Sequence, residues 1–489
     1  MADLQFELSL GRRELIAGES TPMSLEVSNP TEGEMTIPDP RRSPDWPRIR
    51  VRDLDRGTEA TYGPHDLERR RTHEFLPPPR PVAFKLAPKQ VIAWQDELLR
   101  WIELPGSGRY ELTGLMKGPS GEVATRPVAL VVHPLKLVSA AFAGADGGYN
   151  PYRYCVWSHD AGDGGCVVVL SGVSTEGDAP TLAQSRRMAE LDGVVSPALS
   201  IAPNKRPYPA HWLAWLTGKN LSGMYVLQQR TLVPRAERAL DAPTERLLSP
   251  ILLEAAGTDH TRPVRGHALV WQPGLGNARL AVMTFEPEGT VTPGPKITVD
   301  GGVLQWAGVV SLKSGEGRVV LAVQRGDEVD LEVLLRFQGG SVPAQPVSVG
   351  HFEGSVLGAS VTLADDEGMV GAAVVQARSS GGAAVERFRV AVDGSASTSE
   401  SVALEGVRSG DLDRAVIDVT PEGRWLALVR TLDGAWLYAG VDGVCRPLPA
   451  ALEPFGEPIA AYFRKRTDPF VVMASAERGI VYRPLLGRE

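Results

Sequence analysis

The chain has 489 residues, of which 43% are hydrophobic and 22% are charged, an ordinary composition for a globular protein. Its formal net charge is −8. A nucleic-acid-binding protein usually carries a basic balance or a dense basic stripe, so a nucleic-acid partner is disfavoured. No apolar run reaches the ~18–20 residues of a membrane span, and the first residues lack the basic and apolar segments of a secretory signal. We therefore expect a cytoplasmic protein without membrane insertion.

Residues 1–133 alternate apolar and polar side chains in short runs, as the half-buried antiparallel strands of a sandwich do. Two pieces, AGESTPMSLEVSNPTEGEMTIPDP (17–40) and LPGSGRYEL (104–112), resemble bacterial immunoglobulin-like domains. Those domains often carry a pG-x-Y-x-L strand opening and an early G-E-x-x-x-x-x-x-V-x-N strand pair. The resemblance implies a β-sandwich over residues 1–133 and says little about activity.

The segment 39–89 is predicted to be an Arg/Pro-rich insertion in this sandwich. It holds ten Arg and two Lys against eight Asp or Glu, a local net charge of +4. Its densest basic run is Arg69, Arg70 and Arg71. This run is either a weak second contact for an acidic partner or part of a solvated loop with mixed ion pairs.

Residues 134–489 repeat one apolar signature seven times. The runs are spaced by 58, 56, 52, 51, 54 and 45 residues, a period of about 50, and they end at Trp157, Trp215, Trp271, Val323, Val374, Leu428 and Met473. Each run is apolar on both strand faces, and strands come before and after it. Four strands per ~50 residues predict the radially packed sheets of a β-propeller.

The fold class is therefore all-β: an immunoglobulin-like sandwich followed by a propeller of seven four-stranded blades, with six or eight blades as the alternatives. The tryptophans of the repeats, Trp306 and Trp436 included, are expected between blades. The last copy ends about one strand short, and the segment 126–137 can supply the missing strand and close the ring.

Catalytic motifs are scarce in the sequence. It has neither the G-x-S-x-G elbow nor a P-loop, and its histidines and cysteines lack zinc-site spacing. We therefore name no catalytic residue, metal ligand or cofactor. Cys155, Cys166 and Cys445 are expected to be free thiols, with a Cys155–Cys166 bridge across a hairpin as the alternative.

Three connections between the first and second strands of a blade are long, namely 143–154, 202–211 and 256–266, whereas those of blades four to six are short. Equivalent connections lie on one face of a propeller, so the three loops should form one patch. Tyr and Arg are enriched at binding hot spots. The predicted partner-binding residues are Tyr149, Tyr152, Arg153, Arg206, Tyr208, His260, Arg262 and Arg265. Unselected loop growth on a tolerant scaffold is the alternative.

The favoured function is a non-catalytic scaffold that binds a protein partner, within a larger bacterial assembly. One alternative is a carbohydrate-active hydrolase or lyase with its site in the central channel. A lectin-like propeller is the other, and it predicts a polar-aromatic motif in every blade. The sequence leans away from an enzyme and specifies neither the partner nor the oligomeric state.

Overall fold

The structure is a computed structural model of the whole chain. It describes every residue outside 1–3, 39–46, 64–82, 119–120, 145–151, 175–180, 194, 201–209, 228–229, 242–245, 250, 255–261, 275–276, 312–316, 338–346, 365–367, 378–381, 408–409, 465–466 and 486–489. Almost all regular structure is β-strand. The exceptions in this part of the chain are the short helix α2 (Leu98–Trp101) and the 3-10 helix η1 (Ala450–Phe455). Neither is long and apolar enough to span a membrane.

The chain forms two compact units that interleave along the sequence. The first comprises Met1–Lys136, Val169–Glu190 and Ala474–Val481, and the second comprises Leu137–Val168, Leu191–Met473 and Tyr482–Glu489. The first unit therefore takes two segments from the region of the sequence repeats.

The N-terminal part of the first unit holds two larger sheets and one strand pair. The smaller of the two has the order β1 (Gln5–Leu10), β3 (Pro22–Ser28), β8 (Val91–Glu97). The larger has the order β2 (Glu14–Ile16), β11 (Val128–His133), β9 (Gly108–Gly118), β5 (Arg48–Asp53), β6 (Glu59–Tyr62), with β10 (Gly121–Ala124) beside β9. The pair is β4 (Met35–Pro38) and β7 (Ala83–Leu86).

These two larger sheets pack face to face through the alternating apolar residues. Leu25 and Val27 of β3 and Leu112 of β9 are fully buried. Gly114 of β9 lies so close to the ring of Phe6 of β1 that a Cβ there would meet the ring at 3.0 Å. The period-2 pattern thus correctly predicted a two-sheet core.

Within the segment 39–89, residues 39–46 and 64–82 lie outside the described residues, so the predicted insertion stays a prediction. The strands β5, β6 and β7 that fall within this segment join the sheets of the N-terminal part. Strand β11, within 126–137, pairs with β9 and β2. It therefore does not supply the fourth strand expected beside β39 (Gly479–Pro484), because both of its hydrogen-bonding edges are already paired, one with β9 and the other with β2. Arg69, Arg70 and Arg71 lie outside the described residues.

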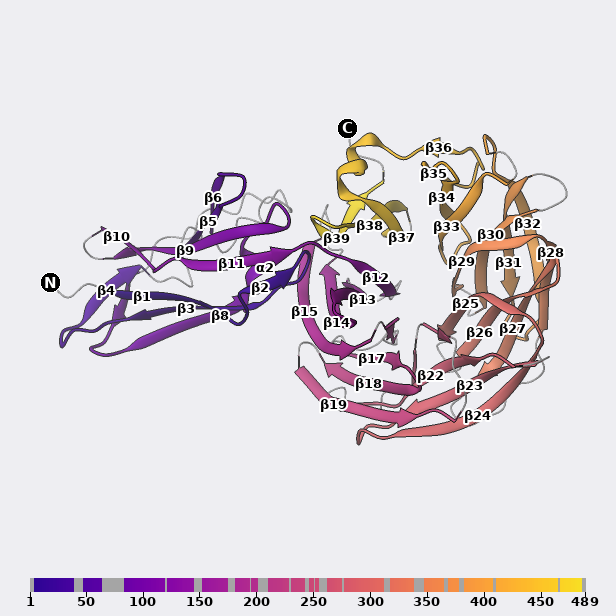
Figure 1. Cartoon of the computed structure of the whole chain (residues 1–489), viewed down its shortest axis with the longest axis horizontal. Coiled ribbons are helices and arrows are strands. Elements are labelled where there is room, and N and C mark those ends of the chain that lie inside the picture. Colours follow the sequence, from indigo (N-terminus) through magenta and orange to yellow (C-terminus); the bar gives the residue numbers. More distant parts are fainter. Residues whose placement is uncertain are drawn as a thin grey trace. The chain divides into compact units, whose positions relative to one another are not determined.

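The repeats form seven successive antiparallel sheets among the described residues, and this is the β-propeller arrangement. Six sheets have four strands or more and the last has three. In chain order they are β12 (Leu137–Gly144) to β15 (Thr181–Asp192); β16 (Ala198–Leu199) to β19 (Arg230–Ala239); β20 (Arg246–Leu247) to β24 (Val291–Asp300); β25 (Val303–Ser311) to β28 (Val347–Glu353); β29 (Ser355–Leu363) to β32 (Ala396–Ala403); β33 (Leu412–Val419) to β36 (Arg446–Pro447); and β37 (Glu457–Arg464), β38 (Asp468–Ser475), β39. Within the second unit they follow one another from magenta β17 through orange β30 to yellow β37 (Figure 1).

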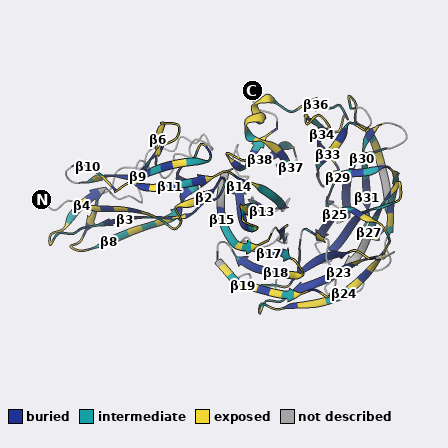
Figure 2. Ribbon diagram, in the orientation of Figure 1, coloured by how far each residue is buried: buried dark blue, intermediate teal, exposed yellow. Residues whose placement is uncertain are grey.

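The second strand of each blade carries the seven apolar runs. These strands are β13 (Tyr152–Gly162), β17 (Ala210–Thr217), β22 (Gly266–Gln272), β26 (Gly317–Arg325), β30 (Met369–Gln376), β34 (Trp425–Thr431) and β38. The third strands β18 (Asn220–Leu227) and β23 (Asn277–Phe285) are also coloured as buried over most of their length (Figure 2).

Successive side chains of a second strand enter different cores. In β22, Ala268 and Val270 belong to the cluster shared with the second blade, whereas Leu269 and Trp271 belong to the cluster shared with the fourth. This follows from the period of two, which places neighbouring side chains on opposite faces of the sheet. Blades three, four and five therefore each pack through apolar side chains against two neighbouring blades.

Trp157, Trp212, Trp215, Trp271 and Trp425 are buried, and Trp212, Trp271 and Trp425 lie in clusters between neighbouring blades, as expected. Trp306 is half-buried on the first strand β25 and packs against the cluster between blades four and five. Trp436, at the start of β35 (Trp436–Ala439), is half-buried. The three cysteines are free thiols.

Candidate functional site

Half of the eight predicted patch residues lie outside the described residues, namely Tyr149, Arg206, Tyr208 and His260. Tyr152 begins β13, but its side chain is likewise not described. Arg262 and Arg265 are exposed beside the third long connection. Arg153 is half-buried and faces the interior of the propeller, as shown below.

The base of the second-blade loop is held by a compact set of hydrogen bonds. The Ser200 N–H donates to the Trp212 carbonyl at 3.0 Å, and the Trp212 N–H donates to the Ser200 hydroxyl at 2.9 Å. The buried His211 donates from Nδ1 to the Ser200 carbonyl at 3.2 Å. Burial lowers the pKa of His211 to about 4, so the imidazole is neutral near pH 7.

Side-chain contacts join this base to the loops on either side. The Tyr154 ring, at the start of the second strand of blade one, lies 4.3 Å from the His211 ring between centroids. On the other side, the Trp212 Nε1–H donates to the Val264 carbonyl of blade three at 2.7 Å. A Cβ on Gly266 would lie 2.5 Å from the Trp212 ring, so glycine permits this close approach. We call Tyr154, Ser200, His211, Trp212, Val264 and Gly266 the loop-base cluster.

The third loop is also fixed at both ends. The Glu254 N–H donates to the Arg265 carbonyl at 3.0 Å, and the Arg265 guanidinium pairs with Glu286 at 2.6 Å. His267 contacts Glu254 through Nε2 at 3.2 Å and Thr284 through Nδ1 at 2.9 Å. Burial lowers the pKa of His267, although the Glu254 carboxylate opposes that shift. These contacts fix the direction in which the third loop leaves the sheet.

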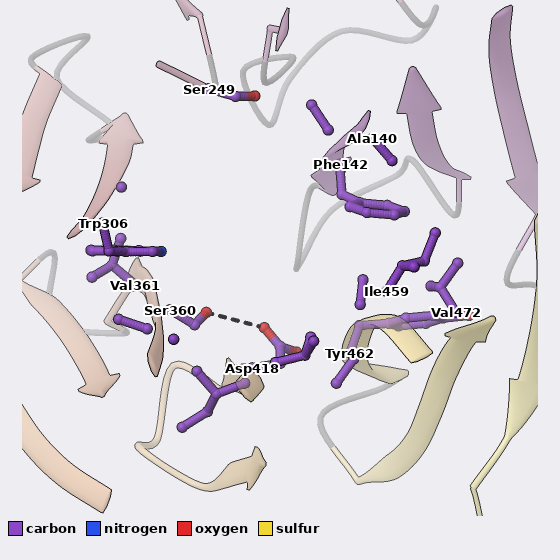
Figure 3. Close-up of a pocket in the computed structure, with 18 of the residues that line it drawn as sticks. Ala140, Phe142, Ser249, Trp306, Ser360, Val361, Asp418, Ile459, Tyr462 and Val472 are labelled. Carbon is purple, nitrogen blue, oxygen red and sulfur yellow. Dashed lines mark hydrogen bonds between the residues drawn. The ribbon is translucent and has the colours of Figure 1, made fainter. Parts of the chain in front are cut away.

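A cavity of about 590 Å³ lies among the first strands of the blades. Most of its described walls are small or apolar side chains of β12, β25, β29, β33 and β37. Phe142 and Trp306 lie on opposite sides of it, and Tyr462 stands beside Asp418 and Ile459 (Figure 3). The charged groups of the described lining are Asp418 and three arginines, Arg153, Arg246 and Arg414.

Hydrogen bonds tie the polar groups of the cavity wall to neighbouring strands. Asp418 of β33 accepts from the Ser360 hydroxyl of β29 at 3.4 Å and from the Phe463 N–H of β37 at 3.0 Å (Figure 3). Gln305 of β25 accepts from the Val356 N–H of β29 at 2.7 Å. The carboxylate and the amide therefore join adjacent blades where their inner strands diverge.

Arg153 and two tyrosines form the wall between the first and last blades. The Arg153 guanidinium lies 5.1 Å from the centre of the Tyr462 ring and donates to the Phe463 carbonyl at 3.4 Å. Tyr482 meets Tyr462 edge to face at 5.9 Å. The Tyr482 side chain is buried, and its hydroxyl has no hydrogen-bond partner among the described residues. Burial holds the pKa of this phenol well above its usual value, so it stays protonated.

No motif in the sequence pointed to Asp418, Tyr462 or Tyr482 as residues of a cavity, and Trp306 was expected between blades. One signal was present, because Asp418 interrupts the apolar run AVIDVT of a strand that is otherwise expected to be buried. The others lie in repeats far apart in the chain, and only the ring arrangement brings them together. Glycoside hydrolysis typically uses two carboxyl groups, and the described lining supplies one, Asp418.

Comparisons with known proteins do not identify a family. No family model and no curated protein matches the chain. Among solved structures it is similar to BBS1N in its complex with ARL6DN, at 12% identity over 71% of this chain and 95% of that one, with a TM-score of 0.34. It is also similar to the WD40 domain of SCAP from fission yeast, at 9% identity over 89% of this chain and 97% of that one, with a TM-score of 0.32. The NanB sialidase of Streptococcus pneumoniae is similar at 9% identity over 88% of this chain and 89% of that one, with a TM-score of 0.29. At these values none of them assigns an activity to this chain.

Proposed function

We propose that this protein is a non-catalytic scaffold whose propeller binds a protein partner through the three long loops of blades one to three. The observation that carries the proposal is the loop-base cluster. Tyr154 contacts His211, and Trp212 bonds to Val264, so the bases of the three loops are neighbours held in fixed positions. Fixed loop bases reduce the conformational entropy that is lost when the loops bind a partner.

The charged groups of the cavity wall make contacts that join neighbouring blades. Both oxygens of Asp418 accept hydrogen bonds from adjacent strands, and Arg153 lies on Tyr462. A carboxylate that joins blades in this way is engaged in holding the ring together. This favours the scaffold over a hydrolase or lyase that acts through the channel.

The N-terminal sheets are proposed to be immunoglobulin-like. In support, the hydroxyl of the buried Tyr110, at the start of β9, donates to the Gly106 carbonyl four residues upstream at 2.7 Å. Such a bond is the tyrosine corner found in immunoglobulin-type sandwiches. We propose that this domain, with the basic run Arg69–Arg71, adds a second contact within a larger bacterial assembly.

Affinity capture from native lysate with quantitative mass spectrometry tests the loop surface. The test variant combines Arg206→Ala with Tyr208→Ala in the second-blade loop. The control combines Arg424→Ala, in the short connection of blade six, with Tyr438→Ala in the same blade. Both variants lose one arginine and one tyrosine, and both are first checked for a wild-type melting temperature.

We expect one stoichiometric partner with the wild type and the control, and at least a tenfold reduction with the test variant, since hot-spot residues contribute more than about 1.4 kcal/mol each. Equal capture by both variants would contradict the loop surface, and Arg69–Arg71 would be changed next. Capture of no partner by the wild type would contradict the scaffold function itself.

A further inference from the structure

The last blade has no fourth strand among the described residues, and its sheet shares no described strand with the sheet of the first blade. Strand β39 is therefore an edge of its sheet, and an edge strand presents unpaired backbone groups unless another element covers it. The segment Ala474–Val481, which connects β38 to β39, belongs to the same compact unit as the N-terminal sheets. So does the part Val169–Glu190 of the first blade. The first unit thus holds a piece of each end of the ring.

Backbone and hydroxyl groups join the N-terminal part to the first blade. The segment 17–21 connects β2 to β3, and its Ser20 N–H donates to the Ser185 carbonyl of β15 at 3.0 Å. The Ser185 hydroxyl donates to the Gly18 carbonyl and lies 3.0 Å from the Ser171 hydroxyl of β14. Ser20, Ser171 and Ser185 are all buried. Because buried polar groups need partners, these bonds hold the segments in one arrangement.

An ion pair reinforces the same contact. The Glu19 carboxylate accepts from the Arg187 Nε–H at 2.8 Å and from an Nη–H at 2.7 Å, so the pair is bidentate. The Glu19 side chain is fully buried, and that of Arg187 is 15% exposed. Arg187 also pairs with Glu190 at 2.9 Å, and Glu190 pairs with Arg12 at 2.8 Å. Removing one partner of a buried pair leaves a charge without compensation, so this contact is costly to break.

A second set of contacts joins the N-terminal part to the last blade. The Leu135 N–H donates to the Ala476 carbonyl at 2.7 Å. The Ser107 hydroxyl donates to the Glu477 carboxylate at 2.6 Å, and the Arg56 guanidinium lies 3.6 Å from the same carboxylate. These groups come from three different connections of the N-terminal part. The connection between β38 and β39 is therefore held at several points.

Gly18 is the residue at which the two sets of contacts meet. Its carbonyl accepts from Ser185 of the first blade, and a Cβ on it would lie 3.3 Å from the Gly479 Cα of the last blade. A Cβ on Gly479 would in turn overlap the Ala17 carbonyl oxygen. Both glycines have a positive φ, +87° at Gly18 and +73° at Gly479, which other residues rarely adopt. The close approach of the two backbones thus requires glycine on both sides.

We propose that the segment 17–21 is a clasp that closes the propeller ring. It holds Val169–Glu190 of the first blade and Ala474–Val481 of the last blade together, in place of the strand that the last blade lacks. Because both contacts use one short segment, loosening either of them loosens both blades. The clasp lies outside the three long loops, and ring closure by it requires no partner protein.

Hydrogen exchange of the full chain, measured by mass spectrometry, tests the clasp. Glu19→Gln weakens the contact with Arg187 in the first blade. We expect exchange at least tenfold faster in residues 181–190 and also in residues 468–484 of the last blade, with β26 and β30 unchanged. The control is Glu122→Gln, which weakens the exposed pair with Arg48 at 3.1 Å and should exchange like wild type, because exposed pairs contribute little.

Gly18→Ala adds a methyl group where the two sets of contacts meet and should have the same effect in both blades. Its control is Gly57→Ala, because Gly57 also has a positive φ, +69°, and nothing lies within 4 Å of its Cβ position. The proposal is overturned if a test variant loosens one blade and leaves the other like wild type, or if exchange is unchanged in both. An equal increase in β26 and β30, or an equal effect of Gly57→Ala, would also overturn it. A test variant that fails to fold is replaced by Ser185→Ala, which deletes one hydrogen bond to Gly18 and is judged by the same criteria.

Discussion

The interface between blades two and three is built from aromatic rings, whereas that between blades four and five is built mainly from small branched side chains. In the first, Trp212 stacks on Phe285 at 4.9 Å and meets Tyr225 edge to face at 5.4 Å. The second is mostly valine and alanine, with Phe388 as its one fully buried ring.

The difference follows the loops. Trp212 packs in the core and also bonds to the Val264 carbonyl at the base of the third loop. A ring with a polar edge can do both, because it has apolar area and one directed donor. In blades four and five the connections are short, and valine packing alone suffices. In blades two and three, therefore, the stability of the core and the position of the loops depend on the same residue.

Truncating one core residue at each of the two blade interfaces should give the largest difference in the free energy of unfolding. Trp212→Ala should reduce the free energy of unfolding by about 3–5 kcal/mol, since it removes a fully buried ring and leaves a cavity. Val320→Ala, in the cluster of blades four and five, should cost about 2 kcal/mol. Urea denaturation measures both. Equal losses would show that the ring interface is no more important than the aliphatic one.

The pH dependence of His211 comes next in size. Its folded pKa of about 4 lies below its ordinary 6.5, so between these values the unfolded chain binds a proton that the folded chain does not. Its contribution is complete above pH 6.5 and is lost as pH falls toward 4, at about 1.4 kcal/mol per pH unit. Denaturation of wild type and His211→Leu from pH 4.5 to 7.5 should give curves that differ in slope across this window. Parallel curves would refute the prediction.

Overpacking tests the glycines beneath the rings. A Cβ on Gly223 would lie 2.5 Å from the Phe285 ring, so Gly223→Ala should cost about 1–3 kcal/mol. Gly382→Ala is the control, because nothing lies within 4 Å of its Cβ position, and it should change stability by less than about 0.5 kcal/mol. Thermal melting of both variants decides. A wild-type melting temperature for Gly223→Ala would mean that the Phe285 ring moves aside to make room for the added methyl group.

The smallest effect concerns His351 in blade four, and its sign is opposite to that of His211. Its hydrogen bond to Asp330, followed by that to Glu328, raises the pKa of this exposed histidine. Its contribution is complete below pH 6.5 and is lost as pH rises through the raised folded pKa. His351→Gln should therefore lower stability at pH 6 and leave it unchanged at pH 9. Salt should reduce the effect at pH 6, since the pair is exposed.

The sequence predicted the repeated core well and the cavity poorly. The run WLAL at 425–428 could be placed between two neighbouring blades because it is apolar on both strand faces, and all four residues are buried. Trp306 is a tryptophan like Trp425 of that run, but it lies in the first strand of its blade, and one face of that strand borders the central cavity. The composition of a strand alone does not show whether one of its faces packs against a neighbouring blade or borders the cavity at the propeller axis.

The loop surface was predicted less well than the repeated core and better than the cavity. The unequal connection lengths drew attention to blades one to three, and the binding role of these loops stays a prediction. The contacts of Tyr154 and Trp212 show that the bases of the three loops adjoin. Arg153 was predicted on the basis of its position beside a loop, yet it lies over Tyr462 inside the ring. One residue along a strand reverses the direction of a side chain, and the register of β13 was not evident from the sequence.

The contact between the first and last blades has a consequence for the order of assembly. Arg153 and Phe463 are 310 residues apart, whereas Trp212 and Val264 are 52 residues apart. Since each doubling of a closed loop adds about 0.6 kcal/mol of entropic cost, this joint is more expensive to form by about 1.5 kcal/mol. On the ribosome, Arg153 emerges long before its partner strand exists. The first blade therefore lacks its contact with the last blade until synthesis of the chain has reached Phe463.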